Sequence, residues 1–197
     1  MTIRQMQQAK DLIAALKAVS ARAMEIDETV DPTVLDRQPA PDAWSAAQVF
    51  DHLCVANDSY VEVVRPVVER AVVGAHGGIA SATWRPSVVG RLLARSMTSE
   101  RKLPAPKQWR PAPDARPNVI GEFLARQGEI EALIERSGSV EWRRMRMSSP
   151  ISALIRMNVG DAFTILVRHE ERHFRQIERT IVTAQGTNGA LAKQTAG

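Results

Sequence analysis

The sequence contains a single cysteine, Cys54, among its 197 residues. No disulfide can therefore form within the chain, and a zinc cluster held by several thiolates is excluded. Cys54 lies in a stretch with helical periodicity, where we expect it to pack as a small hydrophobic residue and not to act as a nucleophile.

Aromatic residues and long apolar runs are also scarce. Aromatic residues make up 5% of the chain, with a single Tyr, so the sequence shows no stacking platform for single-stranded nucleic acid. No apolar run reaches the roughly 18 residues that a membrane-spanning helix requires. The apolar stretch 12–19 is interrupted by Lys17 and has a helical period, so we interpret it as part of a core helix and not as a signal peptide. We expect a cytoplasmic protein that does not bind membranes.

The charge balance is basic but scattered. The formal net charge is +4 and the isoelectric point is about 9.7, yet acidic residues accompany the basic ones along most of the chain. The one local group of basic residues is Arg143, Arg144 and Arg146. We interpret this pattern as a solvated basic surface and expect no nucleic-acid partner.

Hydrophobic residues make up 44% of the chain, which is enough for one buried core at this length. We predict one domain over residues 1–185. The remaining residues, 186–197, are small and polar, and we expect them to form a disordered tail.

Four segments place apolar residues at helical spacing. We predict helices over residues 2–28, ended by Asp31-Pro32, then from Ser45 through Val64, from Val119 to a stop near Gly138, and from Asp161 to Gly186. Ser45 and Gln48 form a capping box at the start of the second helix. Pro66 should kink or end that helix, and Gly74 should stop whatever follows.

Between the second and third predicted helices, residues 74–117 are rich in Gly, Pro, Ser and Arg. Residues 88–97 favour a short helix, and we expect Trp84 and Trp109 to anchor this long connection across the bundle. His76 lies in its glycine-rich part and should be exposed. Residues 145–155 form another connection. Without a long stretch of period two, the predicted fold class is all-α: a four-helix bundle with long crossover connections.

The fourth predicted helix carries His169 and His173. Residues four apart lie on one helix face about one turn apart, so both imidazoles can reach one divalent metal. The spacing also matches the His-Glu-x-x-His motif of zinc metalloproteases, in which Glu170 would be the general base. It equally fits a solvated surface, and a salt bridge with nearby arginines is the simpler interpretation of Glu170, as of Glu171 and Glu178.

His52 lies in the second predicted helix, where a hydrogen-bonded core position would explain it. If the second and fourth helices are neighbours, however, His52, His169 and His173 form a three-nitrogen site with one open coordination position. That pattern is typical of catalytic zinc, which activates a water or a thiolate at the open position. We predict these three histidines as metal ligands.

Metal-bound imidazoles usually donate their second ring N–H to an acceptor. Gln48 and Ser59 lie on the same helix face as His52, and Gln176 follows His173 by three residues. Each of these three side chains is placed for that role, and the sequence does not single one out.

These motifs resemble the DinB/YfiT superfamily of small four-helix-bundle proteins. The resemblance covers about residues 1–184 and is carried by Trp44-Ser45 with Asp51-His52-Leu53, by His169-Glu170-x-x-His173-x-x-Gln176-Ile177, and by Pro150 before a short apolar stretch. It implies a divalent metal, zinc or nickel among others, held by His52, His169 and His173. It also implies crossover connections and frequent homodimers.

Relatives in this superfamily include transferases that use bacillithiol, mycothiol or glutathione, and a mycothiol-dependent maleylpyruvate isomerase. The resemblance therefore implies a metal-dependent enzyme with a small-molecule substrate, acting as a low-molecular-weight-thiol S-transferase or as a hydrolase. The alternative is a stress-response protein that binds metal or a small ligand without turnover. Stoichiometric metal together with turnover of a thiol would separate the two.

Overall fold

The computed structural model describes residues 3–74, 84–98 and 104–195. Within these ranges the chain forms α1 (Ile3–Thr29), α2 (Pro32–Leu35), α3 (Ala46–Gly74), α4 (Val88–Met97), the short 3-10 helix η1 (Lys107–Trp109), α5 (Val119–Ser137), β1 (Arg146–Ser148), β2 (Arg156–Asn158) and α6 (Val159–Thr195). No helix of the described part is both long and apolar enough to cross a bilayer.

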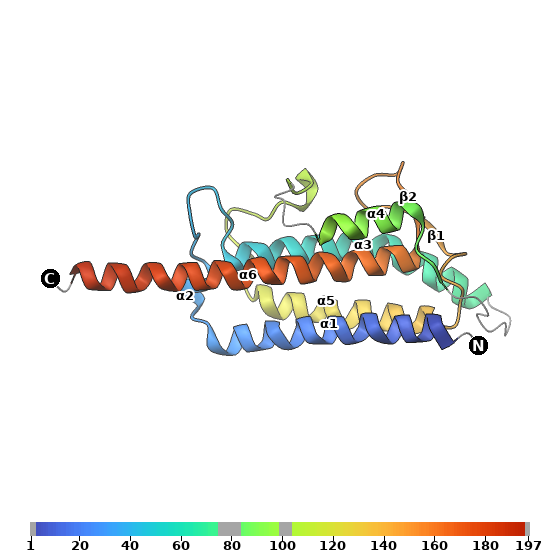
Figure 1. Cartoon of the computed structure of the whole chain (residues 1–197), viewed down its shortest axis with the longest axis horizontal. Coiled ribbons are helices and arrows are strands. Elements are labelled where there is room, and N and C mark those ends of the chain that lie inside the picture. Colours follow the sequence, from blue (N-terminus) through green and yellow to red (C-terminus); the bar gives the residue numbers. More distant parts are fainter. Residues whose placement is uncertain (1–2, 75–83, 99–103, 196–197) are drawn as a thin grey trace.

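Four long helices, α1, α3, α5 and α6, form the bundle (Figure 1). Both α1 and α3 pack against α5 and α6, so α1 lies diagonally across from α3. The chain therefore crosses the bundle between its first two long helices. The connection that holds α4 and η1 leads from α3 to its neighbour α5, and α4 packs along α6. The second crossing is between α5 and α6, which lie on the other diagonal. The all-α prediction and the predicted crossovers are confirmed, and the two histidine-bearing helices, α3 and α6, are neighbours.

The start of α3 is the capping box that the sequence predicts. The Ser45 hydroxyl accepts a hydrogen bond from the Gln48 backbone N–H at 3.1 Å, and the Gln48 side-chain oxygen accepts one from the Ser45 N–H at 3.0 Å. A second reciprocal pair opens α6, where Asn158 and Asp161 each accept from the other's backbone N–H. These caps satisfy amide groups that have no partner inside their helices, and so fix where each helix begins.

The structure corrects the predicted end at Gly186 and decides part of the prediction for Pro66. Of the two outcomes predicted for Pro66, a kink or an end of the helix, the end does not occur, because α3 continues to the predicted stop at Gly74. Val64 and Val68 on either side of Pro66 are fully packed, and we attribute the continuation to this tertiary packing, which offsets the lost backbone hydrogen bond. Gly186 does not end α6, because an interior glycine costs only about 1 kcal/mol relative to alanine. The predicted disordered tail is helical as far as Thr195.

The connection between α5 and α6 contains a small antiparallel hairpin, where the sequence predicts no strand. Its register pairs Arg146 with Asn158 and Ser148 with Arg156. Strands of three residues are too short to show an alternating pattern, which explains why the hairpin was not predicted. The hairpin delivers the chain directly into α6.

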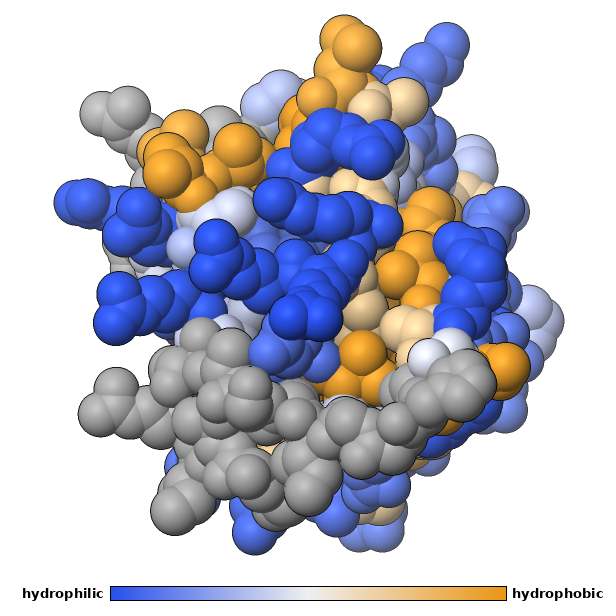
Figure 2. Space-filling model, turned by 90° about the vertical axis from the view of Figure 1, so that its right-hand side faces the viewer, coloured by the Kyte–Doolittle hydropathy of each residue, from blue (hydrophilic) through white to orange (hydrophobic). Residues whose placement is uncertain are grey.

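Indole rings close the bundle end next to this hairpin. Trp84, at 5% exposure, contacts the fully buried ring of Trp142 with centroids 5.7 Å apart, and Trp142 contacts Phe163 at 5.7 Å. The Trp84 indole N–H donates to the Asn158 side chain at 2.8 Å. The expected anchoring role of Trp84 is thus confirmed. On the end face seen in Figure 2, apolar groups alternate with hydrophilic ones and do not merge into one surface.

We expect Gly160→Ala to destabilise the protein by about 2–3 kcal/mol, because overpacking a rigid core has costs of this size. A β-carbon on Gly160 would lie 2.4 Å from the Trp84 ring and 2.7 Å from the Trp142 ring. The matched control is Gly128→Ala on the exposed face of α5, where a β-carbon meets nothing within 4 Å. That change should stabilise by about 0.5–1 kcal/mol. Equal effects in urea unfolding followed by circular dichroism would contradict the packing.

Candidate metal centre

His52 from α3 and His169 and His173 from α6 meet inside the bundle. One ring nitrogen from each lies within 4.8 Å of the other two, and the Nε2 atoms of His52 and His169 are 3.2 Å apart. His52 and His169 are buried, whereas His173 is partly exposed. In the described part of the chain, no further His, Cys, Asp or Glu side chain joins this cluster.

Hydrogen bonds to the Nδ1 atoms orient two of the rings. The Nδ1–H of His52 donates to the Trp109 carbonyl at 2.6 Å, and the Nδ1–H of His173 donates to the Gln176 side-chain oxygen at 3.0 Å. Because a carbonyl oxygen can only accept, the proton of His52 is on Nδ1, and its Nε2 carries a lone pair. The same assignment for His173 aims a second lone pair into the cluster, as metal ligation requires.

Burial keeps the three imidazoles uncharged. Desolvation lowers the pKa of His52, lowers that of His169 well below its usual range, and lowers that of His173 to about 3. The proximity of the other rings adds to the effect at His169 and His173. A neutral imidazole is the form that binds a metal, so at neutral pH the cluster needs to release no proton to do so.

The cluster fits a divalent metal. Bonds of about 2.0–2.1 Å from a tetrahedral zinc ion place two nitrogens about 3.3 Å apart, close to the 3.2 Å between His52 and His169. Three neutral nitrogen donors suit Zn²⁺ or Ni²⁺ and leave the full charge of the ion uncompensated. The predicted ligand set is therefore brought together by the fold.

Two tryptophan rings pack against the histidine cluster. The Trp44 ring centroid lies 5.2 Å from that of His52, and the Trp109 centroid lies 6.0 Å from that of His169. Trp109 is 3% exposed and ends η1. Its indole N–H donates to the Ser59 hydroxyl at 3.0 Å, while its carbonyl holds His52. The sequence identified Trp109 as an anchor but not as the acceptor for His52, because a backbone carbonyl leaves no signal in the sequence.

The three predicted acceptors have three different roles. Gln176 accepts from His173 directly. Ser59 acts one step away, through Trp109. Gln48 does not face a histidine: beyond its cap, its amide donates to the Pro113 carbonyl at 2.7 Å and so fixes the connection before α5.

The environment of Glu170 differs from the one that the sequence predicts. The sequence favoured a salt bridge at the surface, but Glu170 is completely buried. Its Oε1 accepts from the Asn57 amide at 2.8 Å and from the Gln127 amide at 2.7 Å. Burial raises the pKa of Glu170 to about 8, although the two amides oppose the shift. Glu178 does form the expected bridge, with Arg22 of α1.

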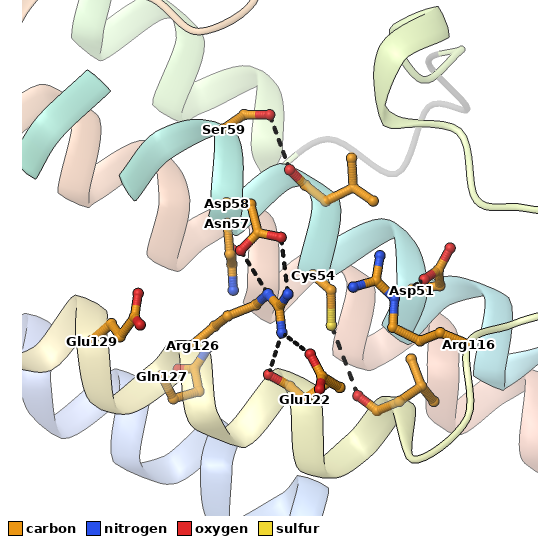
Figure 3. Close-up of polar contacts among 12 residues, drawn as sticks. Asp51, Cys54, Asn57, Asp58, Ser59, Arg116, Glu122, Arg126, Gln127 and Glu129 are labelled. Atoms are coloured by element: carbon orange, nitrogen blue, oxygen red, sulfur yellow. Dashed lines mark hydrogen bonds and ion pairs between the residues drawn. The ribbon is translucent and has the colours of Figure 1, made fainter. Parts of the chain in front are cut away.

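Ion pairs between α3 and the segment around α5 support the helix that carries His52 (Figure 3). Arg126 reaches from α5 to Asp58 on α3 and to Glu122 one turn away. Arg116 pairs with Asp51, the residue before His52.

Cys54 lies in the same interface with no exposed surface, and burial raises its thiol pKa to about 12. Its predicted role as a packed residue is confirmed. His76 lies outside the described residues.

Gln176→Leu is expected to weaken zinc binding about 10- to 100-fold, the usual effect of losing an acceptor that orients a ligand. Leucine keeps the bulk of the side chain but leaves the His173 Nδ1–H without its acceptor. Zinc affinity can be measured by competition with a chromogenic chelator. Arg175→Leu, a change at the exposed neighbour, is the control, and equal affinity in both variants would contradict the positioning role.

Comparison with known proteins adds one match. The sequence profile described as the DinB superfamily matches residues 7–177, which include all three histidines and each long helix in whole or in part. No curated protein and no solved structure matches the chain. With most of its length matched, the chain belongs to the DinB superfamily.

Proposed function

We propose that the protein is a divalent-metal-dependent enzyme whose ion, zinc or nickel, is held by His52, His169 and His173. The observation that supports this most strongly is the convergence of three neutral imidazole nitrogens from two helices, with no fourth His, Cys, Asp or Glu among the described residues. Closed structural zinc sites have four protein ligands, whereas catalytic sites have three and an open position.

We further propose a low-molecular-weight-thiol S-transferase, with hydrolysis of a small molecule as the second reaction type. A bound divalent ion supplies Lewis acidity, which lowers the pKa of a coordinated thiol or water. The protein's own residues prepare the site for this. Three uncharged donors leave the ion's charge uncompensated, the Trp109 carbonyl and Gln176 fix two rings, and Trp44 and Trp109 restrict water.

The metalloprotease alternative is not supported by the geometry. That mechanism requires Glu170 to act as a base beside the metal. Glu170 instead bonds to Asn57 and Gln127, on α3 and α5, in the packed interior. The partly exposed ring is His173, so we propose that substrate approaches from its side of the cluster.

We propose a cytoplasmic homodimer that acts on a small molecule, with no nucleic-acid or membrane partner. The scattered charge supports this, since the basic residues 143, 144 and 146 are too few and too local for a nucleic-acid footprint.

The test of the proposed function is turnover by protein loaded with Zn²⁺ or Ni²⁺. Bacillithiol, mycothiol and glutathione would each be offered with a chromogenic electrophile such as chlorodinitrobenzene, and chelator-treated protein would be the control. We expect thiol conjugation that depends on the metal. Full metal occupancy without turnover of any thiol or of ester substrates would favour the non-catalytic metal-binding alternative and reject the enzyme.

A further inference from the structure

A cavity of about 170 Å³ lies between α4 and the first half of α6. Three arginines line it: Arg91 and Arg95 from α4 and Arg168 from α6. Arg91 and Arg95 are four residues apart and thus lie on one helix face, with Arg168 facing them from the neighbouring helix. None of the three histidines lines this cavity.

Among the residues that line this arginine pocket, positive charge exceeds negative charge. Within the described residues, none of the three arginines forms an ion pair, whereas Arg116 and Arg126 both do. The one carboxylate in the lining is Asp161. Its oxygens are already used, because they accept from the Ser87 N–H at 3.0 Å and from the Asn158 amide at 2.7 Å. Three guanidinium groups and one carboxylate leave two positive charges in excess.

The walls of the pocket are held rigidly. The Ser87 hydroxyl caps α4 by accepting from the Gly90 N–H at 2.9 Å, and the Ser87 N–H donates to Asp161 of α6. At Gly90 the two helices approach so closely that a β-carbon would lie 2.2 Å from the Asp161 carboxylate. Trp84 adds a wall that is itself packed on Trp142. These contacts fix the backbone that carries Arg91 and Arg95 beside that of Arg168. The three side chains are exposed, so solvent screens part of their mutual repulsion, and a bound anion would offset what remains.

We propose that the arginine pocket binds a phosphate dianion, either free or at the end of an ester. Guanidinium groups bind phosphate oxygens with paired, charge-assisted hydrogen bonds. The excess of two positive charges matches a dianion better than a single carboxylate. The volume is below the roughly 300–1,000 Å³ of sites that enclose a whole drug-sized ligand, so the pocket holds the phosphate group and leaves the rest of an ester outside.

The nearby surface gives the phosphate two possible sources. Val88 and Leu92 on the same helix are 73% and 70% exposed, so the phosphate of an anionic lipid could bind with its chains against them. A water-soluble phosphate ester needs no such contact. The shared chemistry is the phosphate group, and the two sources are separable by experiment.

The test compares two double variants that lower the net charge equally. Arg91→Gln/Arg95→Gln removes two of the pocket arginines, and Arg143→Gln/Arg146→Gln removes two exposed arginines elsewhere. Inorganic phosphate would be titrated into metal-loaded protein by calorimetry at constant ionic strength, and again in His169→Ala to exclude binding at the histidine cluster. Co-sedimentation with phosphatidylcholine vesicles, with and without about 20% phosphatidic acid, would test the lipid source.

We expect phosphate to bind the parent protein and the Arg143/Arg146 variant with the same Kd, and the pocket variant at least about tenfold more weakly. Binding of vesicles that depends on phosphatidic acid and on Arg91 and Arg95 would identify a lipid source, and binding of free phosphate alone a soluble one. Equal phosphate binding by both double variants, or no binding to phosphate or vesicles, would overturn the proposal. Either result leaves the histidine site unaffected.

Discussion

His169→Ala is expected to lower the affinity for Zn²⁺ by at least about two orders of magnitude, so that the purified variant contains almost no metal. A site with three protein ligands loses a third of its bonds to the ion when one ligand is removed. The two remaining nitrogens, from His52 and His173, cannot complete the set, because the described residues offer no substitute. Elemental analysis of protein purified without an affinity tag measures the effect directly.

His52→Ala tests the ligand that comes from the other helix and should have the same result. The control is His76→Ala, since His76 falls in the predicted glycine-rich loop and is not a predicted ligand. A variant at His52 that kept full occupancy would contradict the three-histidine centre. The metal would then be held without His52, by His169 and His173 of α6 alone.

Thermal unfolding gives a second readout of the same centre. At a free metal concentration 100 times the Kd, a bound ion adds about 2.7 kcal/mol to stability. For a chain of this size that corresponds to about 5–11 °C in Tm. Chelator should remove this increment from the parent protein and have no effect on His169→Ala. A chelator effect of equal size in both would place the metal elsewhere.

Much of the fold could be predicted because its signals are local. The four long helices, the short α4 and the Ser45–Gln48 capping box each depend on residues within a few positions of one another. The same holds for the histidine pair of α6, whose spacing is that of one helical turn. The contribution of His52 was different, since its role depended on α3 and α6 being neighbours, and only the pattern of the whole chain favoured that arrangement.

The errors come from packing, which local patterns do not contain. Pro66 does not end α3, which was one of the two outcomes predicted for it. Glu170 is buried beside His169, although a charged residue in a polar stretch predicts exposure. In α6 the positions of His169 and Glu170 are about 100° apart around the axis. That rotation turns the His169 ring toward His52 and His173, and the Glu170 side chain toward Asn57 and Gln127. Both directions are buried. The placement of α5, which brings Gln127 to Glu170, does not follow from the local pattern of α6.

Glu170→Gln is expected to make the metal-free protein more stable than the parent at alkaline pH, by up to about 5 kcal/mol. Burial raises the pKa of Glu170 from an ordinary value of 4.5 to about 8. Between these two values the unfolded chain releases a proton that the folded protein retains. The parent therefore loses stability as pH rises from about 4.5 to 8, and reaches a plateau above pH 8 where both states are ionised.

Glutamine has no such dependence and should fit the site. Its side-chain oxygen can accept from Asn57 and Gln127, as the Oε1 of Glu170 does. Its amide nitrogen takes the place of the Glu170 Oε2 and adds a hydrogen-bond donor there. In the parent protein both that Oε2 and the Oε1 of Gln127 lack a hydrogen-bond partner. Glu170→Ala, in contrast, should destabilise at every pH, because it opens a cavity and leaves two buried amides unpaired.

Urea unfolding at pH 5 and pH 8.5 in the presence of chelator measures the difference. The lowered pKa values of the three histidines also change stability with pH, but they are common to both proteins and cancel when Glu170→Gln is compared with the parent. Glu171→Gln controls for loss of a carboxylate at the adjoining position. A Glu170→Gln difference that stays constant between the two pH values would mean that Glu170 is ionised in the fold. The carboxylate would then add a negative charge beside the histidine cluster, and the ion's charge would no longer be uncompensated.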